Sequence, residues 1–348
     1  MTNETASTLR VCVRCGADHS TESDEHPLGE RVCLSCRADQ SKLVKSLLAA
    51  ANEGDKALLA IQGYEIIKEL GQGGMGAVYL ARHFRTGKLV ALKIMIPERP
   101  ADEYAKESFL REAENTRALR HPNVIQLQDW GFSGGVFFFT LEYCNRGSVA
   151  SLIHERGGKL SVPEAIGITF QALDGLEYAH SCHIPYVKLK DGGFGTGRGL
   201  VHRDLKPANL LLSDSTGVIV AKVGDFGLAK AFEMAGLSGQ TLTDQCAGSL
   251  GFMSRHQIVN FKYARPAVDV WAMAASLYYM ITGQTPRDFP AGVDRVRVVL
   301  ESDPVPLRNR DSSIDPRLAE IVDLALDESN CHFKSAADLK SALQNALR

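Results

Sequence analysis

The sequence has little excess charge of either sign and no long apolar segment. Its 348 residues carry 39 Lys and Arg against 41 Asp and Glu, a formal net charge of −2. This balance does not indicate a protein that binds nucleic acid or an anionic membrane surface. The longest apolar stretch, "VDVWAMAASLYYMITG", contains Asp269 and is shorter than the roughly 20 residues that span a bilayer. Since the N-terminus "MTNETASTLR" is too polar for a signal peptide, we expect a cytoplasmic protein without a membrane span.

The eight cysteines fall into two groups. Four are scattered singly, as thiols are in a reducing compartment. The other four form two C-x₂-C pairs: Cys12, Cys15, Cys33 and Cys36. Two such pairs can complete a tetrahedral thiolate site, so the spacing predicts structural Zn²⁺ in a zinc-ribbon-like module at residues 1–38. Two disulfides are the alternative, which a reducing cytosol disfavours, and redox chemistry lacks a βαβ context.

The chain between the two cysteine pairs is acidic. A phosphate-binding surface needs positive charge, so we expect this module to contact a partner protein rather than nucleic acid. The carboxylates of the loop are Asp18, Glu22, Asp24, Glu25 and Glu30. Residues 39–63 read as a helical linker, because apolar residues recur on one helical face until "NEGD" interrupts the pattern.

A glycine-rich segment follows the linker. "GQGGMGAVYL" places Gly71, Gly73, Gly76 and Val78 in the pattern G-x-G-x-x-G-x-V. The next residues are strand-like rather than helical, which excludes a Rossmann dinucleotide site, and the sequence contains no Walker motif. The pattern therefore predicts a hairpin whose backbone N–H groups cover phosphates.

A lysine lies inside the next apolar strand, "GKLVALKIMI". Alternation with period two puts Ala91 and Lys93 on one face and aliphatic residues on the other. A lysine in such a strand is costly to bury without a partner. The polar helical stretch that follows supplies carboxylates, and we expect Glu112 to be the one that pairs with Lys93.

Two more motifs crowd polar groups between apolar runs. "GLVHRDLKPANLLL" contains Asp204, Lys206 and Asn209, and "DFG" begins at Asp225. The glycine loop, "VALK", "HRDLKPAN" and "DFG" occur in the order and spacing of the protein kinase catalytic domain. From residue 64 to residue 348 the chain thus resembles this family, and "LGQGGMGAVYLARH" is especially similar to the Hanks-type, eukaryotic-like Ser/Thr kinases of bacteria.

The resemblance implies an α+β, bilobal protein kinase fold after the cysteine module and linker. Its small β-rich N-lobe would occupy residues 64–141 and its larger helical C-lobe residues 145–348. The implied activity is transfer of the γ-phosphate of ATP to Ser and Thr hydroxyls of protein substrates, with Mg²⁺ as cofactor. The activation segment of the chain itself would be among the substrates.

By the same resemblance, Asp204 accepts the proton of the substrate hydroxyl and Lys206 neutralises the γ-phosphate. Asn209 and Asp225 would hold Mg²⁺, and Lys93, oriented by Glu112, would bind the α- and β-phosphates. The expected adenine site and hinge comprise Val78, Ala91, Leu141 as gatekeeper, Glu142, Cys144 and Leu211. Asp269 resembles the buried aspartate that holds the backbone of the catalytic loop.

The chain departs from the family pattern in two places. Residues 185–199 intervene before the catalytic loop, and "YVKL" followed by "KDGG" predicts a hairpin, either a tolerated surface insertion or a docking surface for a partner protein. Second, Ser254, Arg255 and His256 replace the Ala-Pro-Glu motif, and His332 stands where its arginine partner is expected. With both halves of that ion pair absent, we expect an ordered segment, retained activity, and His256 near His332.

Regulation and two competing functions complete the expectations. Thr241 and Thr243, and less strongly Ser238, are candidate phosphorylation sites whose phosphate would pair with Arg203; the alternative is that these hydroxyls merely suit an exposed loop. Ser249 stands where a Thr usually contacts the catalytic loop. A nucleotide-binding pseudokinase scaffold is the alternative to an active kinase, and a small-molecule kinase is disfavoured by "DLKPAN" and the long activation segment.

Overall fold

The computed structural model describes residues 18, 20, 63–73, 76–95, 103–133, 136–188, 193–214, 217–226, 249–260 and 264–348. They divide into two compact units, here the sheet unit and the helical unit. Of the described residues, the sheet unit contains those before Glu114 together with Leu127–Tyr143, and the helical unit contains the others. The four paired cysteines, the 39–62 part of the linker, Gly227, Ser238, Thr241 and Thr243 lie outside the described residues.

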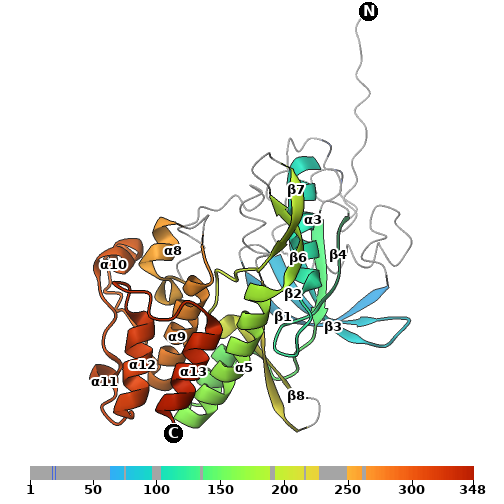
Figure 1. The fold of residues 1–348 in the computed structure, drawn as a ribbon. Helices are drawn as coiled ribbons and strands as arrows, with labels where there is room; N and C mark the ends of the chain where they lie inside the picture. The colour runs from blue at the N-terminus through green and yellow to red at the C-terminus, as the bar shows by residue number, and fades with distance from the viewer. Residues whose placement is uncertain are drawn as a thin grey trace, which may run out of the picture. The chain divides into compact units, whose positions relative to one another are not determined.

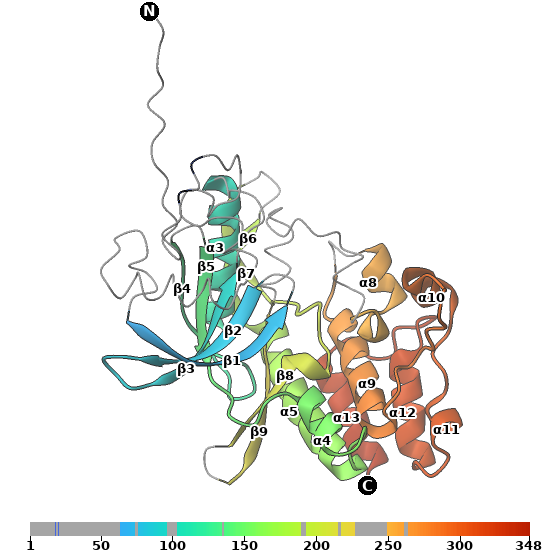
Figure 2. The same cartoon turned by 180° about the vertical axis from the view of Figure 1, so that it is seen from behind.

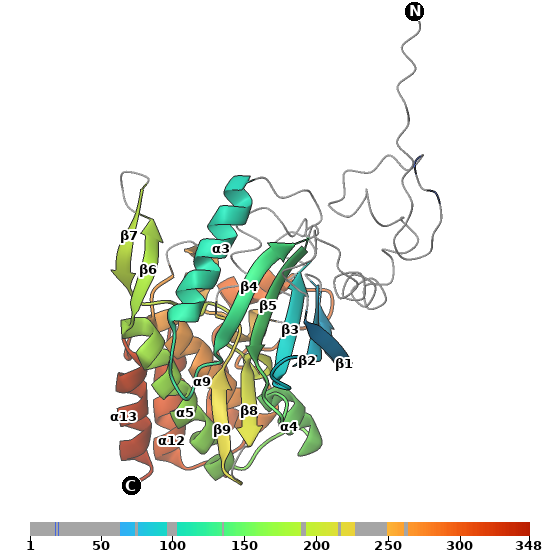
Figure 3. The same ribbon diagram turned by 90° about the vertical axis from the view of Figure 1, so that its right-hand side faces the viewer.

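The sheet unit is built on a five-stranded antiparallel sheet with the order β1-β2-β3-β5-β4. Its elements are β1 (Tyr64–Gly73), β2 (Gly76–His83), β3 (Leu89–Met95), α3 (Glu103–Ala118), β4 (Leu127–Ser133) and β5 (Val136–Glu142). Buried Val90, Leu92 and Ile94 alternate in β3 with the half-buried Ala91 and Lys93, as period-two reasoning predicts. Phe109 of α3 packs edge-on against Phe137 and Phe139 of β5, with ring centroids 4.6 and 5.4 Å apart, and so fixes the helix on that face of the sheet (Figure 3).

The helical unit gathers around α9 (Figures 1 and 2). Its helices are α4 (Val149–Glu155), α5 (Val162–Ser181), α8 (Arg255–Val259), α9 (Ala267–Thr282), α10 (Arg295–Glu301), α11 (Leu307–Arg310), α12 (Pro316–Leu326) and α13 (Ala336–Ala346). Almost every side chain of α9 is buried, Asp269 included, which explains why its sequence is apolar on all faces. A helix of this kind belongs to a protein core, and none of the described helices is long and apolar enough to cross a membrane.

The sequence of α5 sets both its start and its buried face. The Ser161 side chain accepts a hydrogen bond from the Glu164 backbone N–H, which satisfies one of the free donors at the helix start. The carboxylate of Glu164 pairs with Arg156 at 3.2 Å, so the Ser161 and Glu164 pattern of a capping box is completed only on the Ser161 side. Ile166, Leu173 and Leu176, which recur at helical spacing, are buried in the core, and Phe170 packs partly buried against it.

Two hairpins and two short 3₁₀ turns complete the helical unit. They are β6 (His183–Lys188) with β7 (Phe194–Arg198), β8 (Leu210–Asp214) with β9 (Ile219–Val223), η2 (Pro207–Asn209) and η3 (Leu250–Phe252). The β8–β9 hairpin packs on α5, and β8 also meets α4 (Figure 2). The first hairpin confirms the prediction for residues 185–199, and the second begins directly after Asn209 of the catalytic loop.

Candidate active site

The backbone of the catalytic loop is held by one buried carboxylate. Asp269 accepts hydrogen bonds from the backbone N–H of His202 at 2.7 Å and of Arg203 at 2.9 Å, and from His180 Nε2 at 2.7 Å. Burial alone would raise the pKa of Asp269, but the His180 hydrogen bond and the neighbouring His202 outweigh it and lower the pKa. The predicted role of Asp269 is confirmed: it stabilises the positive φ of +67° at Arg203.

Asp204, Lys206 and Asn209 meet at the end of this loop. Lys206 Nζ donates to both carboxylate oxygens of Asp204, at 3.2 and 2.9 Å, and to the Ser249 hydroxyl at 2.7 Å. Asn209 Nδ2 donates to the Asp204 backbone carbonyl at 2.7 Å and to its carboxylate at 3.1 Å. An ionised carboxylate has about four acceptor positions, so Asp204 can still accept a substrate hydroxyl.

The donor set of this loop fits a hard divalent cation. Because Asn209 uses its amide nitrogen to bond Asp204, its side-chain oxygen is the group it can offer a metal. Asp225 adds a carboxylate after β9, on a backbone with φ of +59°. Oxygen ligands of this type are those that Mg²⁺ prefers, so both predicted metal ligands suit the ion expected.

His202 connects the loop to the segment that carries Asp225. Its Nε2–H donates to the Gly224 carbonyl at 2.6 Å, and its Nδ1 accepts from the Asp204 backbone N–H at 3.2 Å. The ring also lies edge-on to Phe226, with centroids 4.8 Å apart. These contacts of the buried His202 ring therefore set the spacing between the catalytic loop and the start of the "DFG" segment.

In the sheet unit, the predicted nucleotide residues share one face. The register pairs Val78 with Lys93 and, on the next strand, Lys93 with Phe139; the neighbouring row pairs Ala91 with Leu141. Residues directly opposite in a ladder point to the same side, so these side chains form a continuous surface. Leu211, expected below the adenine, lies on β8 of the helical unit, where it pairs with Lys222.

The partner of Lys93 stays a prediction. Phe109 of α3 packs on Phe139, the cross-strand neighbour of Lys93, and Glu112 lies one helical turn after Phe109. Residues three apart on a helix lie near one face, so Glu112 is close to the side of α3 that packs on the sheet. This arrangement supports the predicted pair, whose carboxylate is on the exposed rim of the helix.

Gly76 is required by the hairpin itself. Its φ is +146°, and a Cβ there would lie 2.0 Å from the Ile94 carbonyl oxygen on β3. Gly71, in contrast, has no atom within 4 Å of the position a Cβ would take. The two glycines therefore serve different purposes: Gly76 allows β2 to approach β3, while Gly71 leaves open space above β1.

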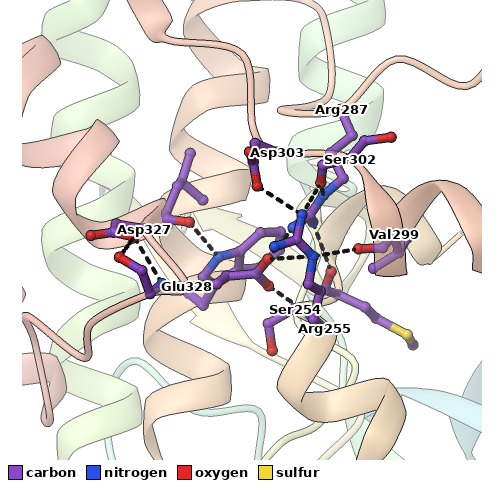
Figure 4. Close-up of polar contacts among 12 residues, drawn as sticks. Ser254, Arg255, Arg287, Val299, Ser302, Asp303, Asp327 and Glu328 are labelled. Carbon is purple, nitrogen blue, oxygen red and sulfur yellow. Dashed lines mark hydrogen bonds and ion pairs between the residues drawn. The ribbon is translucent and has the colours of Figure 1, made fainter.

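The expectation that the ion pair of the Ala-Pro-Glu region is lost is wrong. The segment is anchored by charges of reversed polarity, because Arg255 faces Glu328 (Figure 4). The Arg255 backbone N–H donates to the Glu328 carboxylate at 2.6 Å, and its guanidinium reaches Asp303 at 2.8 Å and the Ser302 carbonyl at 2.6 Å. Arg287, almost fully buried, also donates to Glu328 and lies over the Trp271 ring.

The predicted proximity of two histidines is not what holds this region together. Asp327 accepts hydrogen bonds from the Ser329 hydroxyl and from His332 at 2.9 Å, which lower its pKa to about 2, and the His256 ring contacts Asn260. In the described part of the chain neither histidine is the partner of the other. Instead, Glu328, four residues before His332, accepts the hydrogen bond from the Arg255 backbone N–H.

Sequence reasoning missed three side chains of this region. Gln257 is buried and donates to the Arg203 carbonyl, so the anchored segment contacts the catalytic loop directly. Arg287 and Glu328 were missed as well. The signal available was a charged residue at each of two positions next to apolar runs, "TPRDFP" and "LALDES", which suggests a pair without identifying it.

The comparisons with known proteins agree with this geometry. The protein kinase domain model matches residues 64–194 and 196–327. A probable serine/threonine-protein kinase of Bifidobacterium longum, pknA2, is 30% identical over 276 residues, 78% of this chain and 33% of that protein. Serine/threonine-protein kinase PknB of Mycolicibacterium smegmatis is 30% identical over 287 residues, 80% of this chain and 42% of that protein.

A fungal relative and a solved structure extend the likeness. A carbon catabolite-derepressing protein kinase of Candida albicans is 35% identical over 240 residues, 69% of this chain and 34% of that protein. The crystal structure of the Mycobacterium tuberculosis PknI kinase domain superposes with a TM-score of 0.57 at 23% identity, over 82% of this chain and 96% of that one, and shares the fold.

The chain belongs to the protein kinase domain family. Members of this family use ATP and Mg²⁺. The chain spans about a third to two fifths of the length of the two bacterial relatives it matches.

Proposed function

We propose that this protein is an active serine/threonine kinase that phosphorylates protein substrates. The observation that carries the proposal is the meeting of Asp204, Lys206 and Asn209, joined to Ser249 of the segment that follows. A base, a cation for phosphate and a metal ligand within one hydrogen-bonded group are the parts that phosphoryl transfer needs. A pseudokinase does not need these three groups to be in contact.

The residues of this loop have distinct roles in the proposed reaction. Asp204 accepts the proton of the attacking hydroxyl, while Lys206, now shared between Asp204 and Ser249, turns its charge to the transferred phosphate. Mg²⁺, when bound through Asn209 and Asp225, supplies positive charge that neutralises the phosphates. Lys93 holds the α- and β-phosphates, and the face formed by Val78 and Ala91 receives the adenine.

Phosphorylation of the activation segment is proposed as the means of control. Arg203 Nε is buried and has no hydrogen-bond partner among the described residues, so a cation is available next to the catalytic loop. A phosphate on Thr241 or Thr243 would supply the missing acceptor. Both threonines lie outside the described residues, and the proposal rests on the state of Arg203.

The N-terminal cysteines support a second proposal. We propose that Cys12, Cys15, Cys33 and Cys36 bind one structural Zn²⁺, because two C-x₂-C pairs supply the four thiolates of a closed site. A partner protein would dock on this module, and the scattered cysteines of the remaining chain fit a cytoplasmic location. Native mass spectrometry of the full chain, beside Cys12→Ser with Cys33→Ser, measures the metal: one Zn²⁺ lost in the variant supports the site, and equal masses after correction for the substitutions contradict it.

One experiment tests the kinase proposal. The full chain and Asp204→Asn are purified, treated with phosphatase, incubated with Mg-ATP and a Ser/Thr peptide mixture, and analysed by mass spectrometry. A positioned base contributes about 10²–10⁴-fold to the rate, so we expect phosphate on peptides and on the chain only with the wild type. Phosphate-free spectra for both proteins, together with normal ATP binding, would instead identify a nucleotide-binding scaffold.

A further inference from the structure

The insertion before the catalytic loop carries a bulge on its first strand. Between the pairings of Ile184 and Val187, β6 contributes Pro185 and Tyr186 where β7 contributes Thr196 alone. A bulge takes residues out of the regular ladder and redirects the strand. The backbone N–H and C=O of Tyr186 are thereby turned towards another partner.

That partner is Asn115 in the last turn of α3. Asn115 Nδ2 donates to the Tyr186 carbonyl at 2.8 Å, and Asn115 Oδ1 accepts from the Tyr186 N–H at 2.9 Å. Asn115 is only 2% exposed and both bonds are partly buried, so water has limited access to them. One amide therefore pairs with both backbone groups, as a neighbouring strand would.

The hairpin has a fixed base from which it can hold the helix. Gly199 adopts a φ of +85°, and a Cβ there would lie 2.5 Å from the His180 carbonyl at the end of α5. The Gly199 N–H donates to Cys182, and the Leu200 N–H donates to Ala179. Because the return strand is bonded to α5 in this way, the position of the bulge follows that of a rigid helix.

The same turn of α3 also contacts the "DFG" segment. The Thr116 hydroxyl, one residue after Asn115, donates to the Phe226 carbonyl at 3.1 Å, and both residues are buried. Phe226 follows Asp225 directly, and Glu112 lies one turn before Asn115 on the same helix. A shift of this turn would therefore move the proposed magnesium ligand and the proposed partner of Lys93 together.

We propose that Asn115 is a positioning residue and that the 183–198 hairpin acts as an internal brace. By bonding the Tyr186 backbone, Asn115 fixes the last turn of α3, which sets Glu112 on one side and Asp225 on the other. The hairpin is then neither a passive insertion nor only a docking surface. The catalytic consequence rests on the proposed kinase function, whereas the mechanical bracing of α3 does not.

The kinetic test uses variants matched by mechanism. Asn115→Ala removes both bonds, and loss of two buried hydrogen bonds should lower kcat/KM for ATP about tenfold to a hundredfold. Tyr186→Ala changes only a partly exposed side chain and keeps the backbone groups, so its kinetics should stay within about twofold of wild type. Thr116→Val should share the defect of Asn115→Ala, and Thr116→Ser, which keeps the hydroxyl, should restore activity.

A second measurement is independent of catalysis. Hydrogen–deuterium exchange of the full chain, read on peptides covering 103–118, should show faster exchange in Asn115→Ala than in the wild type or Tyr186→Ala. Should the wild type transfer no phosphate, the kinase proposal fails and this exchange alone decides the brace. Wild-type kinetics and exchange in both Asn115→Ala and Thr116→Val would overturn the inference. If Asn115→Ala does not fold, Asn115→Asp, which keeps an acceptor for the Tyr186 N–H and removes the donor to the Tyr186 carbonyl, should show an intermediate loss, and wild-type kinetics and exchange in that variant would overturn the inference.

Discussion

Removing the carboxylate of Glu328 should destabilise the helical unit strongly. Glu328 is 10% exposed and serves Arg287 and both the backbone and the side chain of Arg255. Its loss leaves the guanidinium of Arg287, 2% exposed, without a counter-ion, although the Ser302 and Met253 carbonyls still accept from it. Breaking a buried pair by deleting one partner costs about 3–5 kcal/mol.

Thermal unfolding measures this cost. For a unit of this size each 1 kcal/mol shifts Tm by about 2–4 °C, so Glu328→Ala should lower Tm by roughly 6–20 °C. The matched control is Asp303→Asn, because Asp303 also pairs with Arg255 but is 87% exposed. Exposed pairs contribute about 0–1 kcal/mol, so this variant should unfold within a few degrees of wild type.

A double-mutant cycle identifies the cause. If the cost of Glu328→Gln comes from the stranded charge of Arg287, adding Arg287→Met should recover part of the loss, since both charges are then gone. Burial lowers the pKa of Arg287 and the Glu328 carboxylate opposes that shift, so the ion pair partly offsets the cost of burying the arginine charge. Equal Tm losses for Glu328→Ala and Asp303→Asn, or no recovery in the double variant, would refute the reasoning.

Three further outcomes are expected. The pKa of Asp269 is held below its ordinary 3.8, so its contribution is complete above that pH and is lost as pH falls through the folded value; the urea midpoint of the wild type should therefore drop more steeply below about pH 4 than that of Asp269→Asn, and parallel curves would contradict this. Gly76→Ala should lower Tm because a Cβ meets a backbone carbonyl, whereas Gly71→Ala should keep Tm and weaken ATP binding in calorimetry; the reverse pattern would exclude the phosphate-cover role. Ser249→Ala should lower kcat severalfold and Ser249→Thr should not, because serine and threonine both supply the hydroxyl that accepts the hydrogen bond from Lys206 at 2.7 Å. Equal rates for the wild type and Ser249→Ala in a steady-state assay would show that this bond is not needed.

Two kinds of signal in the sequence predict parts of the site: strand alternation gives one face of β3, and the resemblance to the kinase family gives the roles of the loop residues. Alternation alone places Ala91 and Lys93 on one face of β3, and the register with β2 and β5 bears this out. The role of Asp269 is implied by the family resemblance, and its position inside an otherwise apolar helix, where an ionised carboxylate must have donors, agrees with that role. In both cases the pattern lies within a few consecutive residues, so it can be recognised from the sequence alone.

The parts that sequence reasoning missed depend on contacts between distant segments. Glu328 is 73 residues from Arg255 and 41 from Arg287, and Asn115 is 71 residues from Tyr186. Electrostatics requires a buried charge to have a partner but does not say at which position. The family's own two positions are those of His256 and His332, whereas the ion pair is formed by Arg255 and Glu328, one and four residues before them.

The reversed anchor bears on catalysis as well as on stability. Arg203 holds a φ of +67°, a strained conformation that persists only when its surroundings determine it from several sides. Asp269 fixes its N–H, and Gln257 fixes its carbonyl from the segment that Arg255 and Glu328 anchor. Loosening that anchor should release one of the two restraints on the residue next to Asp204. Below its Tm, Glu328→Ala should therefore lower kcat for peptide phosphorylation while the KM for ATP changes little. An unchanged kcat in the folded variant would show that Asp269 alone is sufficient to hold the loop.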